Sequence, residues 1–223
     1  YARENKVDPT LSYMLILENK MHEAGVEISR ENLINYGKQL KLFSGVDDWF
    51  GRIKKYGKEN NIDIEHYIIS SGLTNMIEGC SFYSQIDRVY ACEYIFKDAR
   101  GLWPKLSVNY SNKVQYLYRI HKGAFEVNDQ EGVNKKKYLG DHIHVPFENM
   151  IFFGDGETDV PTFNVLNKNN GKSICIYEDQ DQKSIDIAKK LFSDGRVHHL
   201  VKNDYSEGSE VDNLVKEIIK SKT

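Results

Sequence analysis

The arrangement of hydrophobic and polar positions changes once, early in the chain. At first, apolar residues recur at helical spacing in two segments, residues 9–22 and 29–41, with no strand-like run between them. From Phe43 onward, short apolar or β-branched runs alternate with amphipathic segments of helical period. Such alternation indicates an α/β fold with a mainly parallel sheet. We therefore expect a small helical unit, residues 1–42, followed by an α/β core, residues 43–223.

The elements of this core follow from the same pattern. Ser29 opens the second early helix as a cap, Ser111 is a candidate cap of a later helix, and Gly123 is its expected stop. A polar, hairpin-like stretch is expected up to Asn109, and a polar loop over residues 124–147. The remaining elements are predicted as strands at 64–72, 86–96, 149–154, 172–177 and 196–201, and helices at 43–61, 74–80, 111–123, 158–170, 182–195 and 208–222.

Composition and charge restrict the class of function. The 223 residues are 40% hydrophobic and 28% charged, which is ordinary for a soluble globular protein. The net charge of −3 gives no basic surface for nucleic acid or an anionic membrane, and no apolar run approaches the roughly 18 residues of a membrane span. Cys80, Cys92 and Cys175 are odd in number and widely separated, so buried thiols are expected. The sequence predicts a cytoplasmic protein that binds neither nucleic acid nor membrane.

An acidic loop directly follows one of the apolar strands. The strand ends at Gly154, Asp155 comes next, and Asp159 lies four residues further, near the start of a helix. Carboxylate oxygens at a strand end suit Mg²⁺, a hard cation usually held by one or two carboxylates together with phosphate and water. The alternative is that both aspartates only form a turn and cap the helix.

Two further polar features lie near the ends of other predicted elements. Ser70 ends a strand and Ser71–Gly72 opens a short helix, where a hydroxyl and backbone N–H groups suit an anion such as phosphate. Lys113 lies near a helix start, where its charge opposes the helix dipole unless an anion offsets it. Plain capping and a solvated surface lysine are the alternatives, and Lys122 is a nearby rival for Lys113.

The order of these features resembles the haloacid dehalogenase superfamily of phosphohydrolases. Ser70 is similar to that family's second motif, Lys113 to its third, and the acidic loop to its fourth. The resemblance covers residues 43–223. Within it, residues 145–163 and the tail 203–210 look like a branch related to phosphoserine-phosphatase-like enzymes.

The resemblance implies a Rossmann-like parallel sheet, a helical cap in residues 1–42 and Mg²⁺-dependent hydrolysis of a small phosphomonoester. Asp155 would ligate Mg²⁺, while Asp159 would orient Lys113 and support the metal's surroundings. Lys113 would neutralise charge on the phosphoryl group and the nucleophile. Ser70, with the backbone of Ser71 and Gly72, would hydrogen-bond phosphoryl oxygens, so catalysis would consist of positioning and charge stabilisation.

The family's first motif, DxDx(T/V), supplies an aspartate that becomes phosphorylated, and no segment here matches it. Asp8-Pro9-Thr10 has the wrong spacing and no preceding strand, and Asp47-Asp48 lies in a predicted helix. The resemblance therefore implies a strand and nucleophile upstream of Tyr1, next to the strand that ends at Ser70. The alternative is a non-catalytic module that binds a phosphorylated ligand or a protein.

Other hypotheses for the function have less support. A phosphotransferase or mutase would use the same residues, so nothing in the sequence separates it from a phosphatase. A dinucleotide-binding enzyme is not favoured, because no GxGxxG follows a strand. The oligomeric state stays open. Other aromatic and histidine side chains are expected to pack rather than bind: Tyr13, Tyr36, Trp49, Trp103, His66, His198 and His199.

Overall fold

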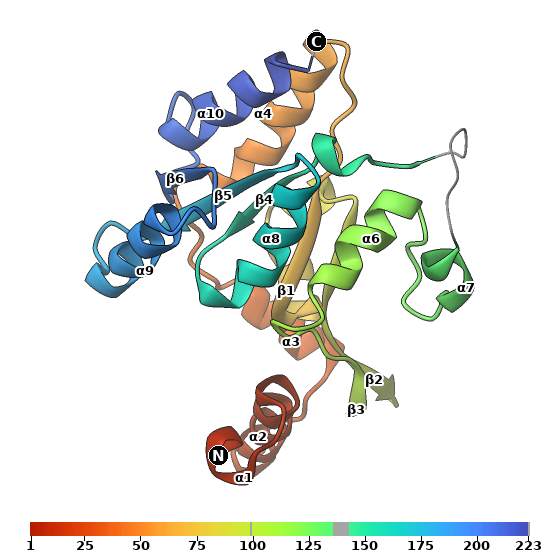
Figure 1. Ribbon diagram of the computed structural model, residues 1–223. Helices are drawn as coiled ribbons and strands as arrows, with labels where there is room; N and C mark the ends of the chain where they lie inside the picture. The colour runs from red at the N-terminus through yellow and green to blue at the C-terminus, as the bar shows by residue number, and fades with distance from the viewer. Residues whose placement is uncertain (99, 136–142, 223) are drawn as a thin grey trace. The chain divides into compact units, whose positions relative to one another are not determined.

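The protein forms two compact units, Tyr1–Asn109 and Tyr110–Thr223, each built on a three-stranded sheet (Figure 1). The computed structural model describes residues 1–98, 100–135 and 143–222. The expected α/β class is confirmed, since helices alternate with strands and both sheets contain parallel pairs. The boundary at Asn109 falls inside the segment expected to form the core. The expected boundary between residues 42 and 43 stays a prediction.

Two helices of the first unit begin at a capping side chain. Asp8 accepts hydrogen bonds from the backbone N–H groups of Thr10 and Leu11, and Ser29 accepts one from Asn32, which confirms the expected cap. Each cap satisfies an N–H group that lacks a partner inside the helix. The helices are α1 (Ala2–Asn5), α2 (Pro9–Glu23), α3 (Arg30–Gly37), α4 (Val46–Glu59) and α5 (Thr74–Glu78).

The sheet of the first unit has the order β1 (Tyr67–Leu73), β2 (Arg88–Lys97) and β3 (Arg100–Leu106). A short 3-10 helix, Tyr83–Gln85, precedes β2. β1 pairs with β2 in parallel, while β3 returns antiparallel to β2. β3 falls in the stretch that was expected to be hairpin-like. Its charged residues and Pro104 interrupt the apolar pattern from which a strand is predicted. The sheet is therefore mixed rather than wholly parallel.

The sheet of the second unit is wholly parallel, in the order β4 (Ile151–Gly154), β5 (Lys172–Tyr177) and β6 (His199–Lys202). Because the three strands run the same way, their carboxyl ends share one edge of the sheet. The helices are α6 (Val114–Lys122), α7 (Gln130–Asn134), α8 (Val160–Lys168), α9 (Gln182–Ser193) and α10 (Glu210–Lys220), with 3-10 turns at Phe147–Asn149 and Glu157–Asp159.

Two expectations for this unit were wrong. Ser111 does not cap α6, because that helix begins at Val114 and the residue in the cap position is Lys113. The expected loop over residues 124–147 contains α7, whose cap residue Asp129 accepts a hydrogen bond from the Gly132 N–H. Residues 136–142 of that loop lie outside the described residues. The stop of α6 is confirmed, since Gly123 has a φ of 68° and ends the helix in the left-handed conformation.

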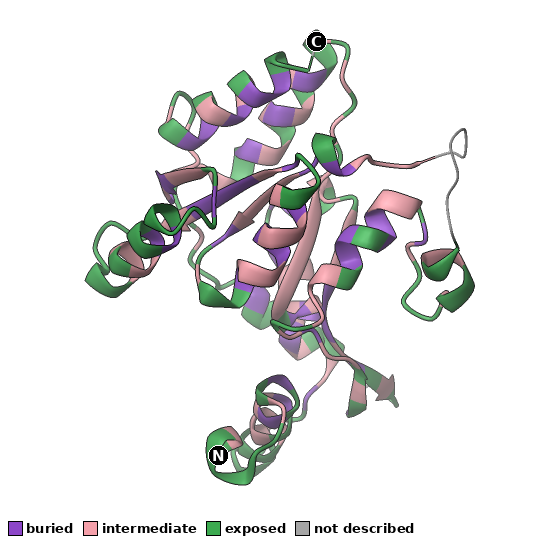
Figure 2. Ribbon diagram, in the orientation of Figure 1, coloured by how far each residue is buried: buried purple, intermediate pink, exposed green. Residues whose placement is uncertain are grey.

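A single apolar cluster holds α8 and α9 against β5. Phe163 of α8 and Cys175 of β5 are fully buried, and Ala188 and Leu191 of α9 pack into the same cluster. α10 contacts β6, and Figure 2 shows buried and exposed residues alternating along it. This packing places the loops after β4, β5 and β6 at the sheet edge described above.

All three cysteines are buried and free, as expected. Among the described residues, no helix combines the length and the apolar character that crossing a bilayer requires.

Two glycines let α3 and α5 approach each other closely. A Cβ atom on Gly37 would overlap the backbone carbonyl of Met76, and one on Gly79 would overlap the carbonyl of Ile34. Both obstacles are backbone atoms, which cannot move aside as the end of a side chain can. The short helix that follows β1 therefore depends on the absence of side chains at this crossing.

We expect Gly79→Ala to lower the free energy of unfolding by about 1–3 kcal/mol, because overpacking forces the two helices apart. Chemical denaturation measures this loss. Gly51→Ala within α4 is the matched control: its Cβ would meet only the flexible end of Gln85. This control should gain up to about 1 kcal/mol from helix propensity. Equal losses in both variants would contradict the close crossing.

Candidate active site

The acidic loop after β4 is shaped by a glycine that leaves no room for a side chain. A Cβ atom on Gly154 would lie 2.6 Å from the Phe163 ring and 2.7 Å from the Asp159 carboxylate. The strand therefore ends with Asp159 folded back against it, while Asp155 lies exposed at the carboxyl end of β4. This is the strand-end position that the sequence predicted for a metal ligand.

Asp159 pairs with Lys113, although the two residues are 46 positions apart. Lys113 Nζ lies 2.7 Å from Asp159 Oδ1, and the two side chains are 11% and 4% exposed. The other carboxylate oxygen accepts a hydrogen bond of 3.2 Å from the Asp155 backbone N–H. One buried carboxylate thus holds both the lysine at the start of α6 and the backbone of Asp155.

The capping alternative for Asp159 does not describe this geometry. Asp159 occupies the cap position of α8, yet its side chain makes no capping hydrogen bond there. Instead its carboxylate offsets the unfavourable position of Lys113 at the start of α6. Lys122 lies at the other end of that helix and donates to the carbonyls of Val133 and Lys135, at 2.6 and 3.1 Å.

Burial controls the electrostatics around Asp159. Loss of water raises the pKa of Asp159, the Lys113 ammonium offsets part of this rise, and the Asp155 charge adds to it. The thiol of Cys175, which lies in register with Gly154, has its pKa raised to about 11, chiefly by burial. That thiol is neutral near pH 7 and fills space rather than acting as a nucleophile.

Tyr205 is a neighbour of the acidic loop that the sequence analysis did not select. It lies in the loop after β6, and its ring centroid is 6.4 Å from that of Phe153 on β4. Burial raises the pKa of Tyr205 to about 12, and the charge of Asp155 contributes to the rise. The sequence drew attention to this region only through residues 203–210, which resemble a phosphatase branch. It gave no indication that Tyr205 contacts β4.

The loop that carries Tyr205 is well anchored. Asp212, fully buried in the first turn of α10, accepts hydrogen bonds from the Gly208 N–H at 2.9 Å and from Lys216 Nζ at 2.7 Å. Ser209 caps the same helix by accepting from the Asp212 N–H. Tyr205 therefore packs near Phe153 of β4 from a loop whose end is fixed to α10.

The donor set at this strand end fits Mg²⁺ only in part. Asp155 offers an exposed carboxylate, and Mg²⁺ prefers such oxygen ligands. Asp159 is engaged by Lys113 and by the Asp155 N–H. The described residues contain no group of three or more His, Cys, Asp or Glu side chains that could hold a metal ion. Water, a substrate phosphate or further protein oxygens would have to complete the coordination.

The Ser70–Gly72 segment belongs to the first unit and lies in a bulge of β1, and one expectation about it was wrong. Ser71 and Gly72 do not open a helix: β1 continues to Leu73, and α5 begins at Thr74. The Gly72 N–H donates to Ser70 Oγ at 3.0 Å. Ser71 and Gly72 therefore provide no helix N-terminus, and the Ser70 hydroxyl lies within β1, where the pairing with β2 is irregular.

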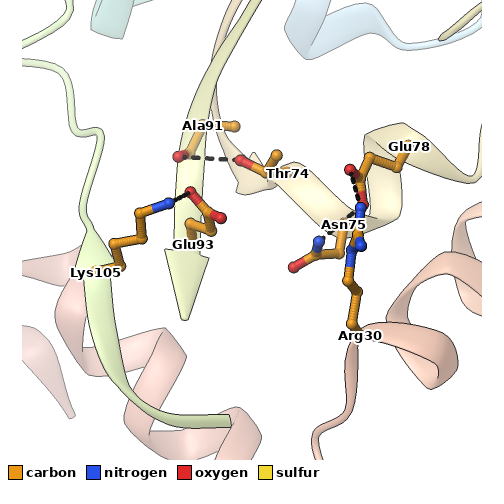
Figure 3. A network of polar contacts seen from close by, with 7 residues as sticks. All are labelled: Arg30, Thr74, Asn75, Glu78, Ala91, Glu93 and Lys105. Carbon is orange, nitrogen blue, oxygen red and sulfur yellow. Dashed lines mark hydrogen bonds and ion pairs between the residues drawn. The ribbon is translucent and has the colours of Figure 1, made fainter. Parts of the chain in front are cut away.

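Polar contacts hold the start of α5, which directly follows β1 (Figure 3). Thr74 donates to the Ala91 carbonyl of β2 at 3.3 Å, and buried Asn75 donates to Glu78 at 2.8 Å. Arg30 of α3 pairs with Glu78 at 2.8 Å. The helix that follows β1 is thus attached both to the sheet and to α3.

Two of the histidines lie in structural contacts. The ring of His66 packs against Trp49 and Phe50, and burial lowers its pKa to about 4. Ser173 donates its backbone N–H to His198 Nδ1 at 3.2 Å.

The comparisons with known proteins give one relative without an assigned activity. An uncharacterized protein of Borreliella burgdorferi is 29% identical over 209 residues, an alignment that covers 84% of this chain and 70% of the relative. No protein-family model matches the chain, and no solved structure matches it. The site must therefore be interpreted from its own geometry.

We expect Lys113→Met to lower the free energy of unfolding by about 3–5 kcal/mol at pH 7, because it leaves the buried Asp159 charge without its partner. Protonation of Asp159 removes that charge, so the loss should shrink as the pH falls. Urea unfolding at a series of pH values measures both effects. Lys122→Met, at the other end of the same helix, is the control, and its free energy of unfolding should show no loss that depends on Asp159. A similar pH-dependent loss in this variant would contradict the pairing of Lys113 with Asp159.

Proposed function

We propose that this protein is a Mg²⁺-dependent phosphohydrolase of the haloacid dehalogenase superfamily that acts on a small phosphomonoester in the cytoplasm. The observation that supports the proposal is the Lys113–Asp159–Asp155 arrangement at the carboxyl end of β4. It combines a lysine held by a buried carboxylate with an exposed carboxylate whose backbone is fixed by the same group. Phosphoryl transfer requires such positioned charges more than it requires covalent chemistry from the protein.

Each residue has a distinct role in this proposal. Lys113, oriented by Asp159, neutralises negative charge on the transferred phosphoryl group. Ser70 donates a hydrogen bond from its hydroxyl group to a phosphoryl oxygen. Asp155 supplies a carboxylate ligand to the metal. Mg²⁺ supplies charge neutralisation on the phosphoryl oxygens when it is bound.

The proposal also requires an aspartate nucleophile, and no segment of this sequence matches the family's first motif. The carboxylate oxygen of this nucleophile forms a bond to phosphorus while the ester P–O bond breaks, and the leaving alcohol takes up a proton. Water then attacks the aspartyl-phosphate, which releases inorganic phosphate and restores the carboxylate. The described chain would contribute the groups that hold and neutralise the phosphoryl group during both steps.

We expect Asp155→Asn to lower Mg²⁺-dependent hydrolysis of p-nitrophenyl phosphate by about a hundredfold or more, because metal charge stabilisation is worth several kcal/mol. The assay uses the natural protein, with and without Mg²⁺. Glu157→Gln is the matched control, since it removes the same charge from the same loop at an exposed side chain, 3.8 Å from Lys190. This control should retain near-normal turnover.

The outcomes separate the proposal from its alternatives. Equal activity of Asp155→Asn and the natural protein would remove the metal assignment. Phosphate binding without hydrolysis would favour the non-catalytic module. Transfer of the phosphoryl group to added alcohols in preference to water would indicate a phosphotransferase with the same site.

A further inference from the structure

The pairing of β1 with β2 is interrupted at the bulge that contains Ser70. Ile69 pairs with Tyr90 and Leu73 with Cys92, so β1 advances four residues while β2 advances two. The residues between Ile69 and Leu73 are therefore displaced from the regular hydrogen-bond ladder. Their backbone groups need other partners, because an unpaired buried carbonyl costs free energy comparable to a lost hydrogen bond.

Tyr13 of α2 supplies the partner for the carbonyl of Ser71. Its hydroxyl donates to this oxygen at 2.7 Å, and the Cys92 thiol approaches the same oxygen at 3.4 Å. Burial raises the pKa of Tyr13 far above the usual range of a phenol. The hydroxyl thus keeps its proton and remains a donor over the whole physiological pH range.

The hydrogen bond to this carbonyl fixes more than one atom. The carbonyl of Ser71 and the N–H of Gly72 belong to one planar trans peptide group, so they point in opposite directions. The Gly72 N–H donates to Ser70 Oγ at 3.0 Å. A hydroxyl that accepts one hydrogen bond in this way can still donate its own proton. The direction of the Ser71 carbonyl therefore sets the orientation of the Ser70 hydroxyl.

We propose that Tyr13 is a positioning residue of the β1 bulge: it holds the Ser71–Gly72 peptide so that the Ser70 hydroxyl is presented to a phosphoryl oxygen. The inference rests on the proposed function, because it takes Ser70 as the group that binds phosphate. It adds that a residue of the N-terminal helical segment determines how well this group binds.

A second tyrosine attaches α2 to β2 through a hydrogen bond that does not involve the β1 bulge. Tyr94 of β2 donates its buried hydroxyl to the carbonyl of Met14 at 2.7 Å. Near the start of α2, Asn109 donates to Asp8 at 2.6 Å. Removing the Tyr94 hydroxyl weakens the attachment of α2 but leaves the contact between Tyr13 and Ser71 in place. The two tyrosines therefore separate a positioning role from a purely structural one.

The test compares Tyr13→Phe, Tyr94→Phe, Ser70→Ala and the double variant Tyr13→Phe/Ser70→Ala in the natural protein. The inhibition constant of inorganic phosphate, together with KM and kcat for p-nitrophenyl phosphate, reports on the β1 bulge, and the melting temperature reports on the fold. Tyr13→Phe should raise the inhibition constant about fivefold to tenfold, the effect of one hydrogen bond. Tyr94→Phe should lower the melting temperature and leave the inhibition constant within about twofold of the natural value.

The double variant tests the path of the effect. If Tyr13 acts through Ser70, Tyr13→Phe should add no further loss of phosphate affinity in the Ser70→Ala background. An equal loss in both backgrounds would overturn the inference, and so would equal increases in the inhibition constant from Tyr13→Phe and Tyr94→Phe.

The measured outcomes distinguish an incorrect role for Tyr13 from an incorrect proposed function. An active natural protein whose phosphate affinity is unchanged by Tyr13→Phe would overturn the role of Tyr13 alone. A natural protein that neither hydrolyses p-nitrophenyl phosphate nor binds inorganic phosphate would overturn both. Hydrogen exchange of the Gly72 amide gives an independent measurement, since Tyr13→Phe should accelerate it while Tyr94→Phe should not.

Discussion

The buried charge of Asp159 is the constraint on which the second unit depends. A carboxylate that is 4% exposed must be matched by a positive charge and by hydrogen bonds, or its desolvation would outweigh the packing around it. Lys113 supplies the charge and the Asp155 N–H supplies a hydrogen bond. Because these partners come from different elements, one electrostatic requirement joins the start of α6 to the end of β4. The candidate site is thus a product of the same requirement that stabilises the unit.

The first unit has a different constraint, because backbone groups of β1 are displaced from the hydrogen-bond ladder of its sheet. The bulged end of β1 is satisfied by side chains, with Tyr13 bonding a carbonyl and Ser70 accepting an N–H. A regular ladder would have used these groups within the sheet and left the Ser70 hydroxyl without a defined direction. In both units, polar contacts between residues distant in the sequence lie at or near the end of a strand. This is where a parallel sheet can combine a stable framework with exposed functional groups.

Much of the fold followed from local patterns, and the exceptions have physical causes. Ser29 capped its helix as expected, because capping depends on a few adjacent residues. The pairing of Lys113 with an anion could also be anticipated, since a cation at a helix start needs one. The contact of Tyr13 with Ser71 spans 58 positions and has no local signature. Tyr205 likewise reaches β4 from beyond β6 only once the sheet has formed.

The order of the strands has a consequence for handling the protein. Within its own unit, and among the described residues, β1 pairs only with β2 and β4 only with β5, so both strands that carry candidate site residues are edge strands. Their sequences, YIISSGL and IFFG, contain neither proline nor lysine, the residues that commonly discourage strands of different molecules from pairing. Intermolecular strand addition, leading to aggregation, is therefore the failure to guard against whenever either unit is produced by itself.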